Sequence, residues 1–139
     1  MKYSPKVNEQ FVRSHKVSAL HPLQDPSTVQ GILEILYKTD LFLREISGMD
    51  RFTFQPASGS QAILAMASIA KAYHASRGES EQRNEIITTL FSHPSDAAAP
   101  AVLGYKVITI YHDESGLPDL EALKKAVSKR TAAFFATNP

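Results

Sequence analysis

The sequence contains no cysteine and no tryptophan, and neither sign of charge predominates in it. The absence of cysteine excludes disulfide bonds and thiolate metal sites. Fifteen Lys and Arg side chains stand against fourteen Asp and Glu side chains, interspersed along the chain. This balance disfavours nucleic acid or an anionic membrane surface as a partner. The five histidines are too scattered along the sequence to predict a metal site.

Long apolar runs are also absent. No stretch of about 18 apolar residues occurs, and no apolar signal core follows Met1. We therefore expect a cytoplasmic protein that neither spans nor binds a membrane. The 139 residues, of which 43% are hydrophobic, can bury one ordinary core, which corresponds to about one domain of roughly 100 to 200 residues.

The hydrophobic pattern predicts an irregular start followed by helices. Residues 1–27 show no apolar period, so we expect an extended N-terminal arm there and a partial large domain over residues 28–139. Helical spacing predicts an amphipathic helix over residues 28–47, capped by Ser27 or Thr28 and ended by Gly48. Residues 62–73 are apolar almost all round, which predicts a helix that is buried on several sides.

Strand and helix signals alternate in the rest of the chain. Nearly continuous apolar runs, typical of strands covered on both faces, predict a mainly parallel sheet with flanking helices and right-handed crossovers. The predicted strands are residues 52–56, 85–90, 106–111 and 132–137, and the predicted helices between them are residues 97–103 and 119–128. The predicted fold class is therefore α/β.

A turn of small residues over 57–61 is the most informative local feature. Gly59 lets the backbone turn closely, and the amides of Gly59, Ser60 and Gln61 at a helix start can receive a phosphate. The hydroxyls of Ser58 and Ser60 could add donors. The alternative is that Ser58 or Ser60 only caps the helix. The turn carries neither a full dinucleotide fingerprint nor a P-loop lysine.

His93 follows the predicted strand over 85–90, at the edge where open parallel sheets bind their ligands. As a single histidine it could stack on a cofactor, act as an acid or base, or be a hydrogen-bonded loop residue. The local pattern leaves these three roles open.

Over its whole length the chain resembles the P-protein of the glycine cleavage system, and in particular its subunit 2 or C-terminal half. The resemblance is carried by blocks in matching order over residues 1–9, 21–24, 29–31, 45–50, 55–61, 72–78, 83–84, 92–93, 104, 119–123 and 137–139. It implies part of the large domain of a fold type I pyridoxal-phosphate enzyme. The implied activity is glycine dehydrogenase (decarboxylating), which decarboxylates glycine and transfers the aminomethyl group to a lipoylated carrier protein.

The resemblance also implies roles for individual residues around pyridoxal phosphate. Ser58, Gly59, Ser60 and Gln61 inherit the phosphate contacts, His93 inherits the position stacked on the pyridine ring, and Thr137 and Asn138 start a loop near the cofactor. No lysine of this chain matches the family's Schiff-base lysine. We therefore predict that the chain contains no catalytic residue of its own, is truncated at its C-terminal end, and works with a second copy or a complementing subunit.

The chain departs from the family where the family usually has His-Gly-Thr-Asn-Pro-Ala. Here residues 93–98 read His-Pro-Ser-Asp-Ala-Ala. Pro94 removes one amide donor, and Asp96 brings a negative charge near a site for anions. Two alternatives therefore stay open: a non-catalytic association module, and a divergent relative without glycine decarboxylase activity. A generic phosphate-binding α/β domain is a third, which the match over residues 1–9 disfavours.

Overall fold

A computed structural model describes residues 5–137. The chain divides into two compact units, Met1–Phe54 and Gln55–Pro139. The boundary between these units, after residue 54, is not the predicted boundary after residue 27. The division into an arm over residues 1–27 and a partial domain over residues 28–139 stays a prediction.

The first unit is helical. It contains α1 (Lys6–Val12), α2 (His15–Ser18), the 3-10 turn η1 (Pro26–Thr28) and α3 (Gln30–Ser47). The expectation of an extended arm was therefore wrong for much of the described part of residues 1–27. None of the residues of α1 or α2 is buried. Because such short helices bury no face, they leave no hydrophobic period in the sequence.

The amphipathic helix predicted over residues 28–47 is confirmed as α3, with two differences at its start. Ser27 and Thr28 belong to η1, where the Ser27 amide donates to the Asp25 carboxylate at 2.8 Å. The residue that precedes α3 is Val29, which has no side-chain cap. At the other end, Gly48 adopts the left-handed conformation with φ 72°, as predicted for a helix stop.

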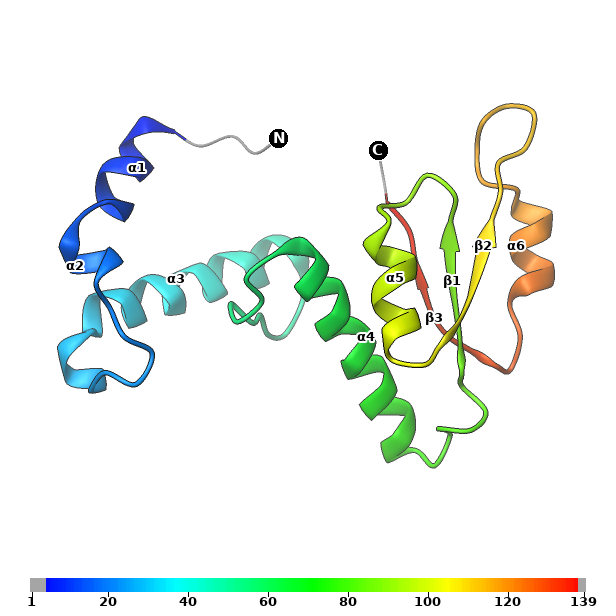
Figure 1. Cartoon of the computed structure of the whole chain (residues 1–139), viewed down its shortest axis with the longest axis horizontal. Coiled ribbons are helices and arrows are strands. Elements are labelled where there is room, and N and C mark those ends of the chain that lie inside the picture. The colour runs from blue at the N-terminus through cyan, green and yellow to red at the C-terminus, as the bar shows by residue number, and fades with distance from the viewer. Residues whose placement is uncertain (1–4, 138–139) are drawn as a thin grey trace. The chain divides into compact units, whose positions relative to one another are not determined.

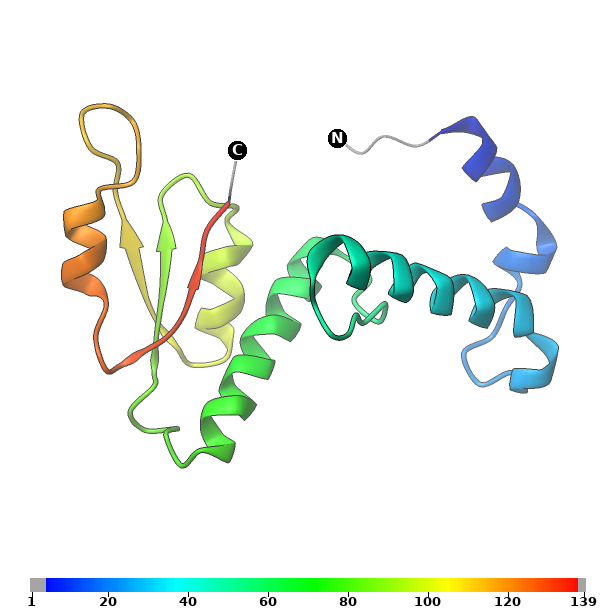
Figure 2. The same cartoon turned by 180° about the vertical axis from the view of Figure 1, so that it is seen from behind.

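The second unit is an α/β layer (Figure 1). Its elements are α4 (Gly59–Ser76), β1 (Glu85–Thr89), α5 (Ser95–Val102), β2 (Lys106–Ile110), α6 (Leu120–Ala126) and β3 (Thr131–Phe135). The three strands form one parallel sheet in the order β2-β1-β3. The α5 and α6 helices lie on opposite sides of this sheet, as Figure 2 shows from behind, which is what two right-handed crossovers in opposite directions require.

Three of the four predicted strands are thereby confirmed, and residues 52–56 are not a strand. This segment has no regular secondary structure. The Phe52 amide donates to the Asp40 carboxylate at 3.0 Å, so it is not available to a strand ladder. Pro56 has no amide hydrogen at all. The apolar alternation of Phe52 and Phe54 alone was therefore misleading.

The core of the second unit is built around β1, whose five residues are all buried. Ile86 and Ile87 have no exposed surface, and they are accompanied by Ala67 of α4, Tyr105 and Ile110. The α4 helix packs on α5 and β3. A parallel strand with neighbours on both sides and helices on both faces is the most protected position in such a fold.

The prediction that the helix over 62–73 is buried on several sides was wrong for the described chain. Within α4 only Ala67 and His74 are buried, while Met66, Ile69 and Tyr73 are each more than half exposed. The reason is that α4 has only α5 and β3 to pack against in this unit. Within residues 5–137, no helix is both long and apolar enough to cross a membrane.

His74 connects the end of α4 to β3 by two hydrogen bonds. Its Nε2 lies 3.0 Å from the carbonyl oxygen of Ala132, and its Nδ1 lies 2.9 Å from Glu79 Oε2. A carbonyl and a carboxylate are both acceptors. The two contacts tie the end of α4 both to the turn that follows it and to β3.

Candidate functional site

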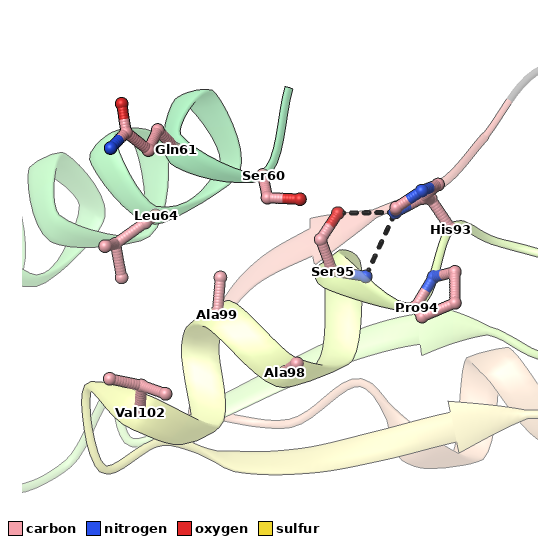
Figure 3. Close-up of a pocket in the computed structure, with 9 residues that line it drawn as sticks. All are labelled: Ser60, Gln61, Leu64, His93, Pro94, Ser95, Ala98, Ala99 and Val102. Atoms are coloured by element: carbon pink, nitrogen blue, oxygen red, sulfur yellow. Dashed lines mark hydrogen bonds between the residues drawn. The ribbon is translucent and has the colours of Figure 1, made fainter. Parts of the chain in front are cut away.

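A hollow of about 440 Å³ lies between the start of α4 and the helix α5 (Figure 3). Its lining combines residues from α4, from the loop after β1 and from α5. They are Ser60, Gln61, Leu64, His93, Pro94, Ser95, Ala98, Ala99 and Val102. Two of the predicted phosphate residues and the predicted stacking residue thus line the same hollow, although they come from distant parts of the sequence.

The start of α4 is built by a reciprocal cap. Ser58 is in an extended conformation, and its Oγ accepts a hydrogen bond from the Gln61 amide at 3.2 Å. The Gln61 side chain in turn accepts from the Ala57 amide at 2.7 Å. The alternative that Ser58 caps the helix is therefore what the described structure contains, and Ser58 is not among the residues that line the hollow.

The cap leaves the first amides of α4 available. Within the described chain, the amides of Gly59 and Ser60 make no hydrogen bond, whereas the Ala62 amide donates to the Ser58 carbonyl at 3.0 Å. A Cβ added at Gly59 would meet no atom within 4 Å. The space beside these amides is therefore open, and the positive end of the helix dipole faces it.

The His93 ring is held by Ser95, two residues further along. The Ser95 amide donates to His93 Nδ1 at 3.1 Å, and the Ser95 Oγ lies 2.7 Å from the same nitrogen. The Asp96 amide donates to the His93 carbonyl at 2.8 Å. Figure 3 shows Ser60 of α4 at the same end of the hollow as the His93 and Ser95 pair.

The two departures from the family pattern have distinct places. Pro94 precedes α5 with φ −52° and lines the hollow, so the start of α5 offers no amide at this position. Asp96 is buried, with 6% of its surface exposed. It does not line the hollow. Its Oδ2 accepts a hydrogen bond from Thr137 Oγ1 at 3.5 Å.

Thr137 follows β3 and lies beside the His93 loop without lining the hollow. Its amide donates to Ser92 Oγ at 3.3 Å, and Ser92 Oγ is 2.7 Å from Thr89 Oγ1 at the end of β1. Asn138, the other residue predicted for this loop, lies outside the described residues. The loop after β3 is thus tied to the residues that flank His93.

The hollow has apolar walls and no charged side chain among its described lining residues. Leu64, Ala98, Ala99 and Val102 form the walls, and polar groups come from Ser60, Gln61, His93 and Ser95. No lysine is in this set. The sequence pattern did not indicate Leu64, Ser95 or the other α5 side chains as lining residues. A serine two residues after the histidine, shortly before the helix predicted over residues 97–103, was the available signal for Ser95.

Comparison with known proteins gives long matches. A protein of Pyrococcus abyssi named "Probable glycine dehydrogenase (decarboxylating) subunit 2" is 49% identical over 139 residues, which are 100% of this chain and 28% of that protein. Proteins of the same name from Thermococcus kodakarensis and Bacillus velezensis are 48% and 45% identical over the same shares. The chain is homologous to glycine dehydrogenase subunit 2 along its whole length. No family model matches it.

The resemblance to the glycine dehydrogenase P-protein is thereby confirmed. The chain spans about 28% of the length of the glycine dehydrogenase subunits it matches. The parallel sheet with flanking helices is also consistent with part of the large domain of a fold type I pyridoxal-phosphate enzyme. The relatives' name describes one subunit of a larger assembly.

Proposed function

We propose that this chain is part of a pyridoxal-phosphate-dependent glycine dehydrogenase (decarboxylating). The whole enzyme would decarboxylate glycine and transfer the aminomethyl group to a lipoylated carrier protein. The observation that carries the proposal is that Ser60, Gln61 and His93 line one hollow in a chain 49% identical to a glycine dehydrogenase subunit.

The start of α4 fits a phosphate group. The amides of Gly59 and Ser60 have no partner in the described chain, and helix amides with the dipole behind them bind phosphate without a nearby cation. Ser60 lines the hollow and adds a hydroxyl donor. Ser58 and Gln61 contribute indirectly, because their side chains hold the turn in the shape that exposes these amides.

The part of the hollow beside His93 fits an aromatic ring. The His93 ring is exposed and fixed by two hydrogen bonds, and the neighbouring walls are apolar. A flat heteroaromatic ring could stack on such an imidazole, and Ala98 and Ala99 would add apolar surface. Bound pyridoxal phosphate supplies an electron sink for the charge that develops when carbon dioxide leaves the amino acid.

The hollow lacks the amine that cofactor chemistry of this kind requires. No described lining residue is a lysine, and Lys71 of α4 instead donates to the Leu103 carbonyl at 2.7 Å. Catalysis by the whole enzyme would therefore use an amine from outside this set of residues. A second copy of the chain, a complementing subunit or further sequence could supply it, and the lipoylated carrier would be the acceptor.

The test is cofactor binding by the purified chain of 139 residues. Titration followed by cofactor fluorescence should give weak, saturable binding of pyridoxal phosphate and at least about tenfold weaker binding of pyridoxal, which lacks the phosphate. Ser60→Ala and His93→Ala should each weaken binding. Ser68→Ala is the matched control, because Ser68 lies on the same helix and bonds only the Leu64 carbonyl. Equal affinity for the two ligands would contradict the phosphate assignment.

A non-catalytic association module is the second candidate function. The exposed apolar side chains of α4, namely Met66, Ile69 and Tyr73, favour it because exposed apolar patches often mark interaction surfaces. This candidate predicts self-association or capture of a complementing chain without any saturable cofactor binding. The cofactor titration, repeated with and without the complementing chain, separates the two functions.

A further inference from the structure

We propose that Ser95 is a positioning residue that fixes the His93 imidazole in the tautomer with the proton on Nε2. The inference deepens the proposed function, on which it rests only for the identity of the ligand. In this arrangement Nδ1 of His93 is occupied by Ser95, and Nε2 remains for a bound molecule.

The tautomer follows from the chemistry of the two contacts. A backbone amide can only donate, so the Ser95 amide at 3.1 Å requires an unprotonated Nδ1. The Ser95 hydroxyl, 2.7 Å from the same nitrogen, then also donates to it. A protonated Nδ1 would instead bring two hydrogens against each other along the amide contact. The proton of the neutral ring is therefore on Nε2.

Ser95 is itself immobilised, so it can hold the ring in one orientation. Only 9% of its surface is exposed, and it is the first residue of α5. Pro94 fixes the backbone before it, and the Asp96 amide bonds back to the His93 carbonyl at 2.8 Å. Residues 93–96 thus form a rigid unit in which the ring orientation is set before any ligand binds.

The consequence is that His93 can offer the hollow a ring face and an Nε2–H donor, but no acceptor nitrogen. A ligand with an acceptor oxygen beside its aromatic ring fits that arrangement. A ligand that needs to donate a hydrogen bond to His93 does not. The Ser95 hydroxyl therefore selects among ligands through the tautomer of His93.

The chain contains a matched control for this contact. Ser115 makes the same pair of bonds to the side chain two residues before it, with its amide 2.8 Å and its Oγ 2.6 Å from Asp113 Oδ1. This pair is on the exposed loop between β2 and α6, and neither residue lines the hollow. Ser115→Ala thus removes an equivalent hydroxyl bond without affecting His93.

The experiment is long-range proton–nitrogen NMR of the histidine rings in the full chain at about pH 9, where ordinary histidines are neutral. His93→Gln assigns the resonance. The wild-type ring should show an unprotonated Nδ1 and a protonated Nε2. Ser95→Ala should move the two nitrogen shifts toward each other as the tautomers mix, Ser95→Thr should restore them, and Ser115→Ala should leave them unchanged. Circular dichroism checks that each variant is folded.

A second measurement uses the ligand. Loss of one hydrogen bond from a preset ring should weaken pyridoxal phosphate binding about three- to tenfold in Ser95→Ala, with rescue in Ser95→Thr. A wild-type ring protonated on Nδ1, or identical ring shifts in wild type and Ser95→Ala, would overturn the positioning role. If the wild type binds no pyridoxal phosphate, the proposed function fails, while the ring spectra still decide the role of Ser95.

Discussion

Thr137 Oγ1 donates a hydrogen bond to Asp96 Oδ2 across 3.5 Å, which joins the loop after β3 to the first turn of α5. Asp96 is the residue whose charge departs from the family pattern. Because its carboxylate is buried and points to Thr137 rather than lining the hollow, the negative charge is kept away from the proposed phosphate contacts. Its place in the first turn of α5 also lets the helix dipole stabilise it.

Removing this contact should destabilise the second unit. We expect Asp96→Ala to lower the free energy of unfolding by about 1 to 2 kcal/mol and Thr137→Val by about 0.5 kcal/mol, since the bond is long and Thr137 is exposed. The double variant should lose less than the sum of the two effects. Urea unfolding of the four proteins measures this coupling, and strict additivity would show that the contact contributes nothing.

Glu85 gives a second stability prediction. It is the first residue of β1, at the end of the strand opposite the hollow. Its side chain is 2% exposed, and its Oε1 lies 2.9 Å from Arg130 Nη2 and 3.4 Å from Lys106 Nζ. Arg130→Ala leaves a buried carboxylate with one longer contact, so it should cost about 2 kcal/mol of unfolding free energy. Lys124→Ala is the control, because the pair of Lys124 with Glu121 is exposed and its loss should cost under about 0.5 kcal/mol.

The pH dependence of stability should have a component from Glu79. The hydrogen bond from His74 is the main cause that lowers the pKa of Glu79 below its ordinary value of 4.5, and Arg77 adds to it. The unfolded chain therefore binds this proton more readily than the folded chain. The stabilising contribution is complete above the ordinary value and is lost as the pH falls through the lowered one.

Glu79→Gln should remove that component. Stability curves from about pH 7 to pH 3 should fall less steeply below about pH 5 in this variant than in the wild type. Glu114→Gln, in an exposed loop, should follow the wild-type curve. If Glu79→Gln and wild type lose stability in parallel over this range, the contact between His74 and Glu79 does not operate in solution.

Two variants in the turn before α4 should distinguish its effect on stability from its effect on ligand binding. Ser58→Ala removes the N-cap and should cost about 1 kcal/mol of unfolding free energy. Gly59→Ala places a methyl group in open space, so it should leave stability unchanged or raise it by about 0.5 kcal/mol. The same methyl group stands beside the free amides and should weaken pyridoxal phosphate binding. A Gly59→Ala protein with full affinity would move the phosphate away from this turn.

The purified chain alone should not decarboxylate glycine. No described lysine lines the hollow, and transfer through the cofactor needs an amine held against it. Incubation with pyridoxal phosphate, labelled glycine and lipoylated carrier should release no more carbon dioxide than a control without protein. Addition of a complementing subunit is the positive arm. Release by the chain alone, with cofactor trapped on one lysine, would contradict this expectation.

The second unit was largely predictable because its signals are local. The segments that form β1, β2 and β3 contain more consecutive apolar residues than an exposed segment would. Asp119 caps α6 by accepting hydrogen bonds from the amides of Glu121 and Ala122. The short helices α1 and α2 were not predictable, since neither buries a residue. The strand prediction for residues 52–56 failed because the hydrogen bond from the Phe52 amide to Asp40 depends on tertiary structure.

The candidate site also has features that the sequence predicts and features that it does not. The rule that ligands bind at the carboxyl ends of parallel strands accounts for the place of His93 after β1. It does not account for the turn before α4, because residues 52–56 are not a strand. It could not indicate which groups hold the ring or where Asp96 points. The direction of Asp96 depends on its contact with Thr137, which exists only once β3 has paired with β1.

The strand order has a consequence for synthesis on the ribosome. β1 is the first strand to be made but occupies the centre of the sheet, with β2 on one side and β3 on the other. Residues 111–130 separate β2 from β3, and at roughly 5 to 20 residues per second this interval lasts about 1 to 4 seconds. During that time one side of β1, with its fully apolar Ile86 and Ile87, has no strand to pair with. A nascent chain of this sequence should therefore be a chaperone client in that interval, and slower translation between β2 and β3 should lower its yield.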